Sequence, residues 1–96
     1  MSLVRNYEAI FVIDLDVGEE NVKALVEKFK NLIETSAQLE SIDEWGKRRL
    51  AYPINKKHDG YYVLANFSSG PDFPRELERN FKITDGILRY LVVKKD

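Results

Sequence analysis

The sequence predicts an α+β domain in which two amphipathic helices cover one face of a four-stranded antiparallel sheet. Four segments have the alternation or the β-branched and aromatic composition of strands, and two have helical spacing. They follow one another in the order strand, helix, strand, strand, helix, strand. This βαββαβ order is that of the split βαβ, ferredoxin-like fold, whose second and fourth strands are the sheet edges.

The first strand is expected over residues 7–14. One set of apolar residues shares a face by the period of two: Tyr7, Ala9, Phe11 and Ile13. Ile10 and Val12 lie on the other face, so this strand is expected at the centre of the sheet, covered on both sides.

The most regular pattern follows and predicts a helix that ends near Thr35 or Ser36. Gly18 is an acceptable N-cap, and Glu19 and Glu20 suit the positive end of the helix dipole. The apolar stripe has i, i+3, i+4, i+7 spacing: Val22, Leu25, Val26, Phe29, Leu32 and Ile33.

The second strand is less regular. Three residues alternate cleanly: Leu50, Tyr52 and Ile54. Trp45 has the opposite parity, and a bulge at Gly46 would bring both sets onto one face. Pro53 cannot donate to a strand ladder, so this strand is expected at an edge.

A hairpin turn is expected over residues 56–60, because Asp59-Gly60 is a strong turn signal. The third strand is then expected over 61–68. Asp72 is the predicted N-cap of a second helix, which has Pro74 in its first turn and ends at residues 84–86. Its apolar positions are Phe73, Leu77 and Phe81. The last strand is expected over 87–94.

Composition narrows the function. The 96 residues fit a single domain, and 44% hydrophobic with 32% charged residues is globular composition. The absence of cysteine excludes disulfides, thiol catalysis and thiolate zinc sites, and it permits a reducing cytoplasm. No apolar run approaches the roughly 20 residues of a membrane span, and no signal-peptide pattern opens the chain. As a hypothesis, residues 1–3 are an expression-vector scar.

The net charge of −1 and a pI near 5.9 argue against a protein that coats nucleic acid by bulk charge. The basic residues are nevertheless clustered, so local contacts with a polyanion remain open. The clusters are Lys47-Arg48-Arg49, Lys56-Lys57-His58, and Arg89 with Lys94 and Lys95. The alternative for each cluster is an ordinary solvated surface.

No converging catalytic set can be assembled from these residues. His58 is the one histidine and falls in a charged turn, where solvation is the ordinary state. Asp14 and Asp16 lack a further ligand to complete a metal site, and their acidic loop repels phosphate. We therefore expect no enzyme activity, no metal and no cofactor.

RNA binding has a better basis. In residues 47–52, basic residues and an aromatic residue run along a predicted edge strand, a pattern that suits phosphates and unpaired bases. The rival interpretation is an edge protected by charge against aggregation. Residues 59–67 loosely echo the third strand of an RNA-recognition motif, but Asp59 and Tyr62 are poor matches to it.

The run Gly46-Lys-Arg-Arg-Leu-Ala-Tyr-Pro-Ile54, preceded by Trp45, resembles the signature of the bacterial ribosomal protein S6 family. The Arg5-x-Tyr7-Glu8 start and the 87–94 segment extend this resemblance over nearly the whole chain. The resemblance implies a ferredoxin-like fold and a cytoplasmic, ribosomal protein of the small subunit. It also implies binding to the central domain of 16S ribosomal RNA as a heterodimer with ribosomal protein S18, without catalysis.

Candidate RNA-binding residues are Arg5, Lys47, Arg48, Arg49, Lys56, Lys57, Arg79, Lys82, Arg89 and Lys94. Candidate contacts to the partner protein are Ile10, Val12, Tyr52 and Tyr90, on the uncovered sheet face or an adjoining edge. The alternative function is a ferredoxin-like protein-interaction module that does not bind RNA.

Overall fold

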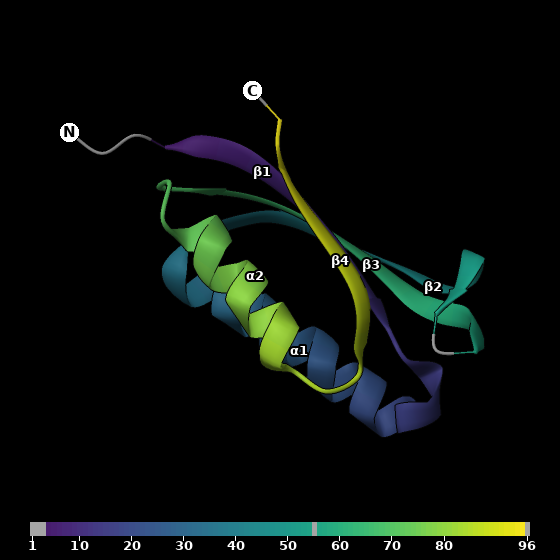
Figure 1. Ribbon diagram of the computed structural model, residues 1–96. Coiled ribbons are helices and arrows are strands. Elements are labelled where there is room, and N and C mark those ends of the chain that lie inside the picture. Colours follow the sequence, from purple (N-terminus) through teal and green to yellow (C-terminus); the bar gives the residue numbers. More distant parts are fainter. Residues whose placement is uncertain (1–3, 55, 96) are drawn as a thin grey trace.

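The computed structural model describes residues 4–54 and 56–95, and its elements follow the predicted order (Figure 1). Residues 1–3, the hypothetical vector scar, lie outside these ranges. The elements are β1 (Arg5–Ile13), the 3-10 turn η1 (Leu15–Val17), α1 (Glu19–Ser36), β2 (Gln38–Ile54), β3 (Lys57–Ser69), α2 (Phe73–Ile83) and β4 (Ile87–Lys94). No helix within the described ranges is long and apolar enough to cross a membrane.

The four strands form one sheet in the order β2-β3-β1-β4, and every neighbouring pair is antiparallel. Both helices lie on the same side of this sheet (Figure 1). The predicted ferredoxin-like fold class is therefore confirmed. β1 is central, and β2 and β4 are the edges, which places Pro53 in an edge strand as expected.

The core lies between the helices and the covered face of the sheet. Its centre is a group of three phenylalanines, one each from β1, α1 and α2. The ring centroids of Phe11 and Phe29 are 5.4 Å apart, those of Phe11 and Phe81 are 5.0 Å apart, and those of Phe29 and Phe81 are 4.5 Å apart. All three side chains are fully buried. The apolar faces of the two helices, predicted from periodicity, thus pack together against the sheet and hold both helices in place.

The β2–β3 hairpin is much longer than its sequence pattern indicates. β2 has 17 residues and begins directly after α1, and β3 has 13 residues. The far end of this hairpin reaches beyond the helices (Figure 1). We call the distal part, residues 45–54 with 56–62, the hairpin arm.

The predicted bulge in β2 is confirmed. The pairing register with β3 shifts between Glu44 and Gly46, and Gly46 has φ +80°, which favours glycine. Trp45 is the extra residue and lies beside Tyr62 of β3. Leu50 packs over Gly60 on this same side. These residues lie on the face of the sheet that is opposite the helices. We call this face the open face.

The predicted turn at Asp59-Gly60 is wrong. Both residues belong to β3, where they pair with Arg49 and Arg48. The chain reverses between Ile54 and Lys57, which face each other across the ladder. Gly60 is instead required by packing, because a Cβ there would lie 2.2 Å from Cγ1 of Val12.

The helix ends agree with the predictions in position. Gly18 is the N-cap of α1, with φ +95°, and Asp72 is the N-cap of α2. The Asp72 side chain makes no capping hydrogen bond, however. Its backbone carbonyl accepts a hydrogen bond from the N–H of Glu76 at 3.4 Å. Helix α2 therefore relies on its buried apolar residues more than on its cap.

Candidate nucleic-acid interface

The arm carries three consecutive basic residues on edge strand β2. Lys47, Arg48 and Arg49 are all exposed and pair across the ladder with Tyr61, Gly60 and Asp59. Because Gly60 faces Val12 on the open face, Arg48 also lies on the open face. Lys47 alternates onto the opposite side, whereas Arg49, on the same edge strand, lines a hollow together with Arg48. The strand thus presents positive charge on both of its faces.

The ion pairs of this region leave much of that charge uncompensated. The Lys47 ammonium lies 4.0 Å from a carboxylate oxygen of Asp59, at the limit of a solvated pair. Within residues 4–54 and 56–95, Arg48, Arg49 and Lys56 make no ion pair. These three cations are available to an anionic partner.

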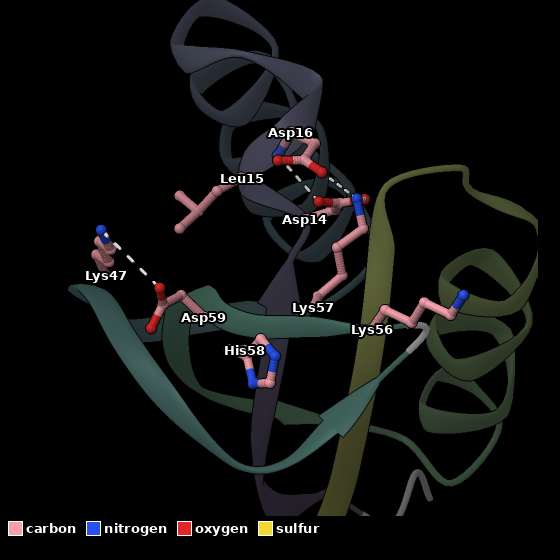
Figure 2. A pocket seen from close by; sticks show the side chains of 8 residues that line it. All are labelled: Asp14, Leu15, Asp16, Lys47, Lys56, Lys57, His58 and Asp59. Carbon is pink, nitrogen blue, oxygen red and sulfur yellow. Dashed lines mark hydrogen bonds and ion pairs between the residues drawn. The ribbon is translucent and has the colours of Figure 1, made fainter.

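Lys57 is bound within the protein. Its ammonium donates a hydrogen bond to Asp16 and lies 3.5 Å from a carboxylate oxygen of Asp14 (Figure 2). The hydrogen bond to Asp16, with the charge of Asp14, raises the pKa of Lys57 above its ordinary value. Lys57 therefore ties the start of β3 to the η1 turn, whereas Lys56 points away from this cluster (Figure 2).

The hollow around Lys57 has mixed charge. It measures about 360 Å³ and is lined by Asp14, Leu15, Asp16, Lys47, Lys56, Lys57, His58 and Asp59. Three carboxylates offset three lysines there, so the hollow has no strong preference for an anion. His58 is exposed, and the described residues contain no group of three or more histidine, cysteine or acidic residues that could hold a metal ion.

The open face is apolar beside β4. Ile10 is half-buried, and Leu91 and Val93 are 55% and 38% exposed. A shallow hollow of about 190 Å³ lies here, lined by Ile10, Val12, Tyr62, Arg89, Tyr90 and Leu91. An apolar face of this kind, with Arg89 beside it, has the character of a protein interface.

The four candidate partner contacts lie in different environments in the structure. Ile10 lies on the open face and Tyr52 is 73% exposed on the arm. Val12 is buried under its neighbours. Tyr90 pairs with Phe11, so it belongs mainly to the covered face, and its ring stacks on Phe81 at 5.3 Å. Leu91 and Val93, which the alternation of β4 places on the same face as Ile10, were not among the candidate contacts.

The remaining basic candidates do not converge on the arm. Arg5 starts β1, Lys94 ends β4, and Arg89 lies on the open face beside Val12. Arg79 and Lys82 lie on α2, in the helical layer. Arg79 donates two hydrogen bonds to Glu76, at 3.2 and 2.5 Å, and this contact lowers the pKa of Glu76.

Comparison with known proteins is consistent with this geometry. The family model described as ribosomal protein S6 matches residues 6–94. The small ribosomal subunit protein bS6 of Caldanaerobacter subterraneus subsp. tengcongensis is 56% identical over 94 residues, covering 97% of this chain and 99% of the relative. The protein of the same name from Clostridium novyi is 52% identical with the same coverage.

A crystal structure of 30S ribosomal protein S6 from Thermotoga maritima superposes with a TM-score of 0.91 and 30% identity, covering 97% of this chain and 89% of that one. These matches and the fold define the class: a ribosomal protein built on a ferredoxin-like sheet. More particularly, the chain belongs to the ribosomal protein S6 family. It is a component of the cytoplasmic ribosome of bacteria, as the resemblance in the sequence implied.

Proposed function

We propose that this protein is a non-enzymatic structural constituent of the small (30S) ribosomal subunit that binds the central domain of 16S ribosomal RNA together with ribosomal protein S18. The observation that carries the RNA contact is the arm, where Arg48 and Arg49 are exposed and free of ion pairs with the described residues. Guanidinium groups on a projecting edge strand can reach phosphates without a concave site.

The net charge of the chain requires help from a partner. At −1, the whole protein gains little from long-range attraction to RNA, so binding depends on a few local phosphate contacts. A basic partner such as S18 would add the missing charge. The protein alone should therefore bind RNA weakly, and the pair should bind it tightly.

The apolar open face is the surface on which we place S18. Leu91 and Val93 expose apolar area on edge strand β4, and Ile10 continues it toward the sheet centre. Burying such area drives association at about 25 cal/mol per Å² before the costs of binding. This assignment leaves the arm free to contact RNA from the same complex.

The test is a filter-binding titration of a 16S central-domain fragment, with and without S18, at two salt concentrations. The R48A/R49A double variant should bind more weakly and lower the salt slope by about one unit per lost phosphate contact. The matched control is K23A/K30A, which removes two positive charges from α1. Equal RNA affinities of the two variants would contradict the proposed RNA contact.

The same titration distinguishes the proposed function from a second candidate, a protein-interaction module. The open apolar face would equally suit a protein-interaction module that never binds RNA. That function predicts tight S18 association with no RNA binding by the complex at either salt concentration.

A further inference from the structure

The bulge in β2 creates an aromatic pair on the open side of the arm. Trp45, the extra residue, keeps 45% of its surface exposed. Its ring lies next to that of Tyr62, with centroids 6.5 Å apart and planes only 13° from parallel. Gly46, at φ +80°, is the backbone position that allows this arrangement. The two rings therefore present parallel flat surfaces at one place.

Positive charge surrounds these rings. Arg48 and Arg49 line the same hollow of about 330 Å³ with Trp45 and Tyr62, and no carboxylate of the described residues lines it. Neither arginine forms an ion pair within the described ranges. A ligand with a flat group and a nearby anion would match both the aromatic rings and the two arginines.

We propose that this hollow binds one unpaired base of an RNA, stacked on Trp45 or Tyr62, with Arg48 and Arg49 on the adjoining phosphates. Unpaired bases stack on aromatic side chains, and arginine contacts the backbone beside them. A base inside a duplex has both of its faces covered by neighbouring pairs and cannot stack in this way. The inference rests on the proposed function and deepens it, because it names the RNA element that the arm recognises.

A protein side chain fits the hollow less well. An apolar group would cover the rings but leave two guanidinium charges partly desolvated and without counter-charges. A nucleotide supplies the flat apolar group and the anion together. The hollow is therefore better matched to RNA than to an apolar segment of a partner.

Trp45 is the only tryptophan of the chain, so its emission reports on this site alone. The experiment titrates the complex of the full chain with tryptophan-free S18 against the 16S central-domain fragment. A second series uses fragments in which single unpaired nucleotides are replaced by abasic sites. Stacking predicts that the fragment quenches Trp45 emission and that one abasic position removes the quenching.

Variants at Trp45 test the contribution of the ring. Trp45→Leu should weaken RNA binding about 5- to 150-fold, the range given by base–aromatic stacking. Trp45→Phe keeps an aromatic face and should retain most of the affinity. Because Trp45 is half exposed, both variants should keep the wild-type Tm, measured by circular dichroism.

The outcomes separate this inference from the proposed function. Wild-type affinity of Trp45→Leu with weakened R48A/R49A would overturn the stacking site and leave the RNA-binding function standing. Quenching of Trp45 by S18 alone, with none added by RNA, would assign the hollow to the partner and also overturn it. No RNA binding by the folded wild-type complex would overturn both.

Discussion

Gly60 shows how a single residue without a side chain brings three strands together on the open face. It lies in β3, between Val12 of β1 and Leu50 of β2. A Cβ at this position would lie 2.2 Å from Val12 Cγ1 and 3.5 Å from Leu50 Cδ2. Leu50 is 8% exposed and Val12 3%, although both helices lie on the other side of the sheet (Figure 1). The missing side chain therefore creates a small second core at the base of the arm.

We expect Gly60→Ala to lower the free energy of unfolding by about 1–3 kcal/mol, because it overpacks this contact. Denaturant unfolding measures the change. The Val12→Ala background removes the clashing methyl group, so Gly60→Ala should cost much less there, and a double-mutant cycle gives the coupling. Equal costs in both backgrounds would show that Val12 is not the source of the strain.

At the scale of the element, polar contacts hold β2 and β3 to each other and to the body. The Tyr61 hydroxyl donates a hydrogen bond to Glu44 at 2.8 Å, which raises the pKa of Tyr61. Lys57, paired with Asp16 and Asp14, also has a raised pKa. In both cases the protonated form is stabilised by folding. The free energy of unfolding that each contact contributes is therefore fully present below the pKa of the unfolded state, near 10. It is lost as the pH rises through the pKa of the folded state.

This sign gives a test with Tyr61→Phe, which removes only the hydroxyl group. Wild-type protein should be more stable than this variant by about 1 kcal/mol or less between pH 7 and 9. The difference should shrink as the pH rises above about 10, because the tyrosinate can no longer donate to Glu44. Urea unfolding of both proteins at half-unit pH steps measures it. A difference that stays constant to pH 11.5 would contradict the assigned hydrogen bond.

At the scale of the whole molecule, the two faces of the sheet have different tasks. The covered face is buried under both helices and contains the phenylalanine centre of the core. The open face retains exposed Leu91 and Val93 together with Arg89. The arm extends this second face beyond the helices (Figure 1). One side of the molecule thus stabilises the fold, and the other remains exposed, where we propose that the partner and RNA bind.

Leu91→Asp tests the partner surface. A charge in the apolar part of the open face should weaken S18 binding, measured by calorimetry, because the aspartate loses its hydration in the complex. The free energy of unfolding should change by about 0.5 kcal/mol or less, since Leu91 is 55% exposed. Ile83→Asp, on an exposed position of α2, is the control and should leave S18 affinity unchanged. Equal losses for both variants would place the partner elsewhere.

The sequence alone was sufficient to predict the order of the elements, both helices and the bounds of β4. These segments have strong hydrophobic periodicity, which depends only on local sequence. It was also sufficient for the family, and for the bulge beside Trp45. It did not place the start of β2, because residues 38–44 are mostly polar and become a strand only by pairing with β3.

Only the tertiary structure decided which residues meet. Asp59-Gly60 has the pattern of a turn, yet the crowding around Val12 requires the glycine within a strand. Lys57 belongs to a basic cluster in sequence, yet the fold places Asp14 and Asp16 beside it. The Trp45–Tyr62 pair depends on strand register, which joins residues far apart in the chain. Local pattern thus predicts elements, whereas contacts between distant residues follow from their packing.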